Sequence, residues 1–167
     1  MRTTSPLSRS SGSLLDSPCW RTRVLAWAQR WLMWEVWPQS LALLAARLYL
    51  CQVFFRSGLT KVADWDATLF LFAEEYHVPL LSPELAAWMG TGGELVLSAL
   101  LAVGLLTRPA ALGLFIVNAM AVISYPDLSA AALKDHHLWG VLSASLALFG
   151  AGLVSADALA WWRLRKA

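Results

Sequence analysis

Apolar residues along the chain form long continuous runs that are separated by short polar segments. The runs predict four membrane-spanning helices, at about residues 41–61, 83–106, 109–124 and 136–154. An α-helix rises 1.5 Å per residue, so about 20 residues cross a hydrocarbon core of about 30 Å. The third run is the shortest and stops before Pro126. The predicted fold class is all-α, an integral membrane four-helix bundle.

The polar segments carry signals for helix ends. Ser82, Pro83 and Glu84 place an N-cap, a first-turn proline and an acid before the second run. Asp64 or Asp66 can cap a short helix, with Trp65, Leu69, Phe72 and Tyr76 on one face. Thr107, Arg108 and Pro109 are predicted to form a tight turn, and Ser155 to Asp157 to cap a final short helix.

The chain before the first run has two parts. Residues 1–18 are rich in Ser, Thr, Pro and Arg and are predicted to be a disordered tail. Within residues 19–39, a helical stripe is formed by Trp20, Val24, Trp27, Trp31 and Trp34. A Trp stripe beside arginines is typical of an N-terminal amphipathic helix lying in the headgroup region. The same helix could instead pack against the cytoplasmic ends of the bundle, and the two interpretations are compatible. The folded domain is predicted over residues 40–157.

The composition is typical of a membrane protein, and the distribution of charge predicts how the chain is oriented in the membrane. The chain is 58% hydrophobic and 14% charged, against about 25% charged in soluble domains. Five Lys and Arg residues precede Ser40, and three follow Trp162 in the basic segment 158–167. The loop between the first two runs is acidic. The positive-inside rule therefore predicts that both termini face the cytoplasm. The net charge of +2 gives no indication of nucleic-acid binding.

Three polar residues at a similar depth in the apolar runs are candidate site residues. Glu94 lies near the middle of the second run, Asn118 near the middle of the third, and Arg47 about one turn to the cytoplasmic side of the middle of the first. A charge at this depth costs roughly 2.5–3.5 kcal/mol on insertion scales. Arg47 and Glu94 are therefore expected to pair at the polar centre of the bundle. These residues form either an internal clamp or a proton or ligand site.

A second group of candidates lies toward the outer side. Lys61, Tyr125, His136 and His137 are predicted to gather at one mouth of the bundle. A His and a Lys there would suit a quinone carbonyl or an anion. Adjacent histidines point about 100° apart on a helix, so no metal site is predicted. The cysteines, Cys19 and Cys51, form no metal-binding or CxxC spacing.

Several of these motifs, in this order, resemble the DoxX family. They are the stretch from Arg47 to Lys61, the pair Gly93-Glu94, the segment from Gly104 to Arg108, and His137 to Gly140. The resemblance covers about residues 41–157. It implies a bacterial inner-membrane protein of four helices, and it selects Arg47, Gly58, Lys61, Glu94 and Arg108 as the residues of the family pattern.

The resemblance also implies a function. DoxX proteins are linked to quinone reduction and to oxidative or metal stress, so the leading hypothesis is a small subunit of a quinone-linked redox system. Such a subunit would work with a membrane or peripheral redox protein rather than catalyse alone. The alternative is a non-enzymatic membrane anchor or a permease-like bundle that supports metal-stress tolerance.

Overall fold

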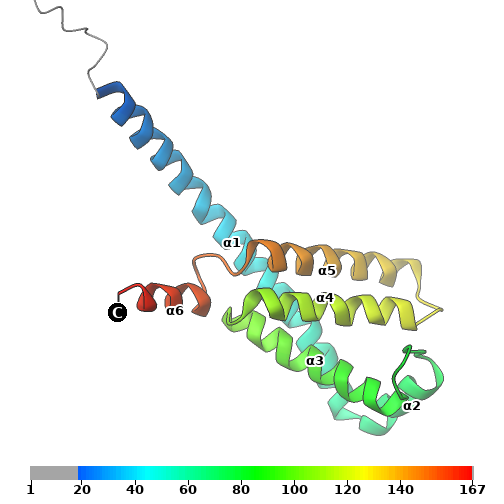
Figure 1. Cartoon of the computed structure of the whole chain (residues 1–167). Coiled ribbons are helices and arrows are strands. Elements are labelled where there is room, and N and C mark those ends of the chain that lie inside the picture. Colours follow the sequence, from blue (N-terminus) through cyan, green and yellow to red (C-terminus); the bar gives the residue numbers. More distant parts are fainter. Residues whose placement is uncertain (1–18, 167) are drawn as a thin grey trace, which may run out of the picture. The chain divides into compact units, whose positions relative to one another are not determined.

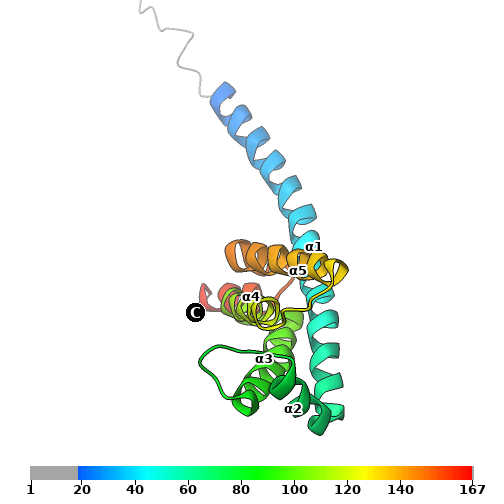
Figure 2. The same cartoon turned by 90° about the vertical axis from the view of Figure 1, so that its right-hand side faces the viewer.

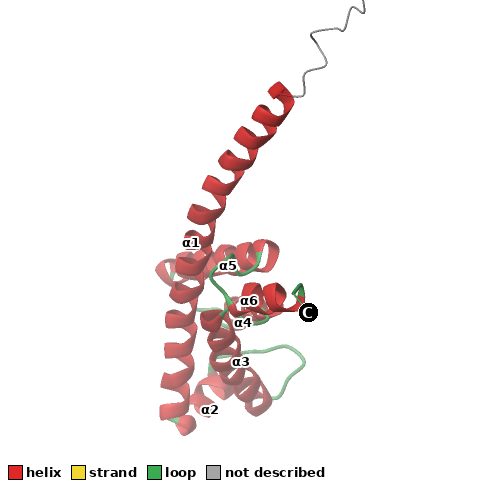
Figure 3. Ribbon diagram, turned by 90° about the vertical axis from the view of Figure 1, so that its left-hand side faces the viewer, coloured by secondary structure: helices red, strands yellow, loops and turns green. Residues whose placement is uncertain are grey.

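The computed structural model describes residues 19–166, which are helical throughout apart from short connections (Figure 3). The predicted tail 1–18 lies outside the described residues. Within the described part there are six helices and no strand: α1 (Cys19–Ala63), α2 (Trp65–Glu74), α3 (Pro83–Val103), α4 (Thr107–Ser124), α5 (Ala130–Phe149) and α6 (Ala156–Leu164). The prediction of an all-helical protein is confirmed.

The first helix is longer than the sequence predicts. α1 continues through Pro38, where we expected one helix to end and the next to begin. A proline removes one backbone hydrogen bond but need not end a helix. The helix continues past Pro38 into the packed part of the protein, where Ser40 is buried. The chain divides into two compact units, Met1–Val36 and Trp37–Ala167, and α1 crosses the division. Apart from Trp27, the side chains of the Trp stripe lie outside the described residues.

The second unit has a core made by four helices. Its buried side chains include Leu50 and Phe54 from α1, Leu101 from α3, Leu114 from α4 and Leu146 from α5. α4 packs beside α5 and beside α3, and α2 packs on α3 (Figures 1 and 2). The loop at 75–82 meets the end of α4, where the His77 N–H donates to the Ser124 carbonyl at 2.8 Å.

The predicted N-terminal caps of three helices are confirmed. Asp64 caps α2, Ser82 caps α3 with Pro83 in the first turn, and Ser155 caps α6. The prediction of a turn at residues 107–109 is wrong, because these residues open α4. The turn lies just before them, where Gly104 and Leu106 both have positive φ, +74° and +49°.

Within residues 19–166, three helices are long and apolar enough to cross a membrane. They are the part of α1 from Val36 to Ala63, then α3 and α4. α5 starts earlier than the predicted fourth span and ends at Phe149. Its early turns carry four polar residues in a row, Lys134, Asp135, His136 and His137. Those residues lower the hydropathy of α5, which is not among the three candidate spans found within residues 19–166.

Candidate functional site

A buried ion pair joins the first two apolar helices. The Lys61 ammonium on α1 donates to both carboxylate oxygens of Glu94 on α3, each at 2.8 Å, and to the Ser57 hydroxyl at 2.8 Å. The side chains of Lys61 and Glu94 are only 17% and 12% exposed. A carboxylate that accepts two hydrogen bonds from an ammonium can remain charged at this depth, since each charge compensates the other.

A glycine one turn earlier allows the two helices to come this close. A Cβ placed on Gly58 would lie 2.8 Å from the Leu95 side chain and 3.4 Å from the Cβ of Glu94. Any larger residue would push α1 and α3 apart or displace Leu95. The spacing Gly58-x-x-Lys61 therefore sets the backbone separation and places the ammonium opposite Glu94.

The expected pair of Arg47 with Glu94 is wrong. The Arg47 guanidinium is 1% exposed, and it donates to four backbone carbonyls. Its nitrogens reach Leu101 at 2.8 Å, Ala102 at 3.0 Å, Ala151 at 2.9 Å and Val154 at 2.8 Å. The first two carbonyls belong to the last turn of α3, where unpaired carbonyls and the helix dipole favour a cation.

The chain makes room for this arginine with another glycine. A Cβ on Gly104 would lie only 2.5 Å from Arg47 Nη2. Backbone carbonyls have no side-chain signature, so the sequence could not show that they, rather than Glu94, satisfy Arg47. The sequence did identify the residue as buried within a helix, but not its partners.

Asn118 has a third set of partners. Its amide donates to the His136 carbonyl at 2.9 Å, and its Oδ1 lies 2.8 Å from His136 Nδ1. Asn118 therefore ties α4 to α5. Among the described residues, no hydrogen bond joins Arg47, Glu94 and Asn118 to one another. The three residues predicted as one polar centre instead make three separate connections.

The residues that were predicted to gather at the outer mouth also have separate partners. Lys61 belongs to the ion pair, and His136 to Asn118, with its ring edge-on to Trp139 at 4.8 Å. His137 is exposed, and its Nδ1 lies 2.8 Å from the Leu133 carbonyl of its own helix. Tyr125 follows α4, where the charge of Glu75 and a hydrogen bond with it raise the pKa of the Tyr125 phenol.

Sequence reasoning missed Tyr76 as a site residue. Its ring stacks on Phe72 at 4.9 Å and lies 5.4 Å from the ring of Tyr125. Burial raises the pKa of the Tyr76 phenol, and the negative charge of Glu94 raises it further. The Tyr76 phenol is therefore within electrostatic range of the Glu94 carboxylate. The regular spacing of Phe72 and Tyr76 identified a packed face but gave no sign of the nearby carboxylate.

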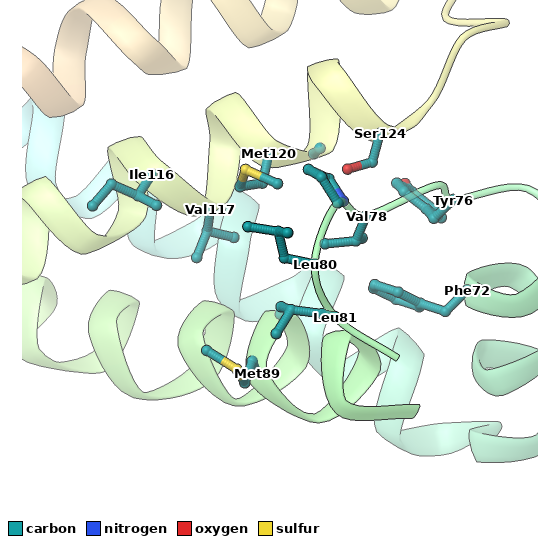
Figure 4. Close-up of a pocket in the computed structure, with 13 residues that line it drawn as sticks. Phe72, Tyr76, Val78, Leu80, Leu81, Met89, Ile116, Val117, Met120 and Ser124 are labelled. Carbon is teal, nitrogen blue, oxygen red and sulfur yellow. The ribbon is translucent and has the colours of Figure 1, made fainter. Parts of the chain in front are cut away.

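Tyr76 also lines a cavity of about 400 Å³ (Figure 4). The cavity lies between α3, α4 and the loop at 75–82, and its walls are almost wholly apolar. Residues 19–166 contain no group of three His, Cys, Asp or Glu side chains that could hold a metal ion. The site thus consists of a buried ion pair and an apolar cavity that is lined by Tyr76.

Long apolar helices with compensated charges between them define an α-helical membrane protein. The family model for DoxX matches residues 42–126, half of the chain, and the chain belongs to the DoxX family. The match includes Arg47, Gly58, Lys61, Glu94 and Asn118, and it ends before α5. Comparisons with curated proteins and with solved structures find no match.

Proposed function

We propose that this protein is a small subunit of a quinone-linked redox system in the bacterial inner membrane. In this proposal α5 is a fourth span, and both termini face the cytoplasm. The distribution of Lys and Arg supports the orientation, because they are concentrated before Ser40 and after Trp162. The core shared by α1, α3, α4 and α5 supports the fourth span. The working partners are the lipid bilayer and a membrane or peripheral redox protein.

The ion pair between Lys61 and Glu94 is the observation that carries the proposal. Reduction of a quinone to a quinol consumes two electrons and two protons, so such a system needs groups that can pass protons near the membrane. Protonation of Glu94 would remove its charge and leave Lys61 uncompensated, so the protonation states of the two groups are coupled.

Cells in which the gene is deleted provide the test. The ratio of oxidised to reduced quinone, extracted from the membranes, should differ from that of the parent strain. Wild-type protein should restore the ratio, and Glu94→Gln should not restore it although it accumulates to the same level. Arg56→Gln serves as the matched control, because Arg56 is an exposed charge on the same helix as Lys61.

Two outcomes would contradict the proposal. An unchanged ratio in the deletion strain would remove the link to quinone. Full restoration by a stably accumulated Glu94→Gln variant would show that the ion pair has no part in the reaction. The ion pair would then be a structural clamp of a non-enzymatic membrane anchor or permease-like protein.

A further inference from the structure

The cavity between α3 and α4 has walls suited to an uncharged, apolar molecule. Of the described residues that line it, Tyr76 and Ser124 alone have polar side chains, and none is charged. The other walls are formed by apolar residues such as Phe72, Leu81 and Val117. Its volume, about 400 Å³, lies within the range of about 300–1,000 Å³ that is usual for ligand pockets. A charged ligand would find no counter-ion in these walls.

One polar group in the wall has no partner in the protein. Ser124 is 1% exposed, and its hydroxyl makes no hydrogen bond. Its backbone carbonyl is already occupied by the His77 N–H. Figure 4 shows the hydroxyl oxygen turned toward the side chains of the cavity. A buried hydroxyl without a partner costs about 1–3 kcal/mol, so a bound molecule with an acceptor would relieve a real cost.

A water molecule is a poor candidate for that acceptor. Buried waters usually make two to four hydrogen bonds, and genuinely apolar cavities stay dry. Here the two hydroxyls of Tyr76 and Ser124 are the polar side-chain groups available in the wall. The cavity therefore favours a molecule that fills it with hydrocarbon and presents one oxygen to Ser124.

The mouth of the cavity is apolar and exposed. Leu80 is fully exposed, Met89 is 57% exposed and Ile116 is 54% exposed. An exposed apolar rim on membrane helices faces lipid rather than water, so a ligand would enter sideways from the bilayer. Ser124 ends α4, and Ile116 lies eight residues earlier, about 12 Å deeper along the helix. The polar end of a ligand would thus lie near the membrane surface and its tail would run inward.

We propose that this cavity binds a neutral, lipid-soluble molecule whose carbonyl oxygen accepts a hydrogen bond from the Ser124 hydroxyl and whose hydrocarbon tail runs between α3 and α4. Two sources supply this chemistry, the ring carbonyl of a prenylated quinone and the ester carbonyl of an acyl lipid. The inference does not require that Lys61 and Glu94 handle protons, so it goes beyond the proposed function.

Photolabelling of the full-length protein in lipid nanodiscs tests the site. The probe is a long-chain ketone that carries an alkyl diazirine, and mass spectrometry of peptides locates the label. We expect saturable labelling of the segments 78–81 and 117–124. Ser124→Ala should weaken saturable binding about fivefold, because a neutral hydrogen bond contributes about 1 kcal/mol. The variant should remain folded, since no bond within the protein is lost.

Ser143→Ala is the matched control. Ser143 on α5 is also fully buried with an unpartnered hydroxyl, but it does not line the cavity. Labelling of this variant should equal that of the wild type. A second variant, Ala121→Phe, fills the cavity from α4 and should abolish the saturable labelling. Equal labelling of Ser124→Ala and the wild type would overturn the proposal even if Ala121→Phe fails to fold.

Competition identifies the source of the ligand. Competition by 2-methyl-1,4-naphthoquinone alone would assign a quinone, and competition by methyl dodecanoate alone would assign an acyl lipid. Competition by both would define a site for neutral carbonyl compounds in general. Dodecane, which lacks the carbonyl, should compete poorly. If none of these compounds competes, or if dodecane competes as well as the others, the label reports lipid exposure and the proposal is wrong.

Discussion

At the scale of single residues, each buried charge in this protein has a different kind of partner. Glu94 is compensated by an ammonium from another helix, whereas Arg47 is held by carbonyls at helix ends. Neither solution is visible in the spacing of the residues along the chain. Both are consistent with the high cost of an uncompensated charge among apolar helices.

The ion pair predicts a specific pattern of coupling. Lys61→Met leaves Glu94 uncompensated and should lower the free energy of unfolding by roughly 3–5 kcal/mol. The double variant Lys61→Met with Glu94→Gln should recover part of that loss, because neither charge then remains. Unfolding in mixed detergent micelles, followed by helical circular dichroism, measures these energies.

A second double-mutant cycle, of Arg47 with Glu94, is the control for the cycle of Lys61 with Glu94. Arg47→Met should also destabilise the protein, because four backbone carbonyls, in two buried and two partly buried hydrogen bonds, lose their donor. The loss in free energy of unfolding caused by Arg47→Met should simply add to the loss caused by Glu94→Gln, since the two residues share no hydrogen bond. Non-additivity in this cycle, together with additivity for Lys61 and Glu94, would contradict the assignment of partners made here.

Asp157 predicts a dependence of stability on pH. Its carboxylate accepts from the backbone N–H groups of Leu106 at 2.8 Å and Thr107 at 2.9 Å, at the start of α4. Burial alone would raise the pKa of Asp157, but the hydrogen bonds from Thr107 and Leu106 and the charge of Arg47 lower it below its ordinary value of 3.8.

The sign of the effect follows from that direction. A pKa lowered by folding adds stability that is fully present above the unfolded value, and it is lost as the pH falls through the folded value. Asp157→Ala should therefore cost about 0.5–2 kcal/mol at neutral pH, as loss of a helix cap does. The difference from the wild type should shrink below about pH 3.8. A constant difference between pH 7 and pH 3 would show that the carboxylate charge plays no part.

At the scale of helices, two glycines on neighbouring helices have opposite roles. Gly58 on α1 sits against Leu95, whereas a Cβ on Gly92 of α3 would meet nothing within 4 Å. The first glycine is needed for the close approach of α1 and α3. The second has no steric role that the structure shows.

Substituting alanine for each glycine should distinguish the glycine that is needed for packing from the one that is not. Gly58→Ala should lower the free energy of unfolding by about 1–3 kcal/mol, because the new methyl group overpacks the contact with Leu95. Gly92→Ala should be neutral or stabilising by up to about 1 kcal/mol, since alanine favours a helix over glycine. Thermal unfolding in detergent compares the two. Addition of Leu95→Ala to Gly58→Ala should restore stability, and failure to do so would contradict the packing argument.

At the scale of the whole molecule, the open structural point is the path of the chain through the bilayer. α1, α3 and α4 have the length and composition of membrane spans, and α5 carries four polar residues in its early turns. Because α5 shares the core through Leu146, we expect it to cross the membrane with the other three.

Reporter fusions test the four-span topology. Fusions after Glu75 and after Asp127 should be active as periplasmic reporters, and fusions after Arg108 and at Ala167 as cytoplasmic ones. A periplasmic and a cytoplasmic reporter are each fused at all four positions. Where one reporter is inactive, the other should then be active. A periplasmic signal at Ala167 would show that α5 does not cross.

The sequence by itself determined the class of the protein, the order of its apolar helices and the capping residues of three helices. These features depend on local properties: long apolar runs, and capping residues such as Asp64, Ser82 and Ser155 beside the helices they start. It also identified Arg47, Glu94 and Asn118 as polar groups in apolar surroundings, and Lys61 as a candidate at the outer mouth. The free-energy cost of placing such a side chain among apolar residues depends on residue type alone.

Only the tertiary structure decided how these residues are paired. Lys61 rather than Arg47 reaches Glu94 because Gly58 brings α1 against α3, and Arg47 finds carbonyls that no side-chain pattern reveals. The continuation of α1 through Pro38 and the unpartnered hydroxyl of Ser124 over an apolar cavity belong to the same category. Each depends on contacts between segments far apart in the chain, and the spacing of residues within one segment carries no information about them.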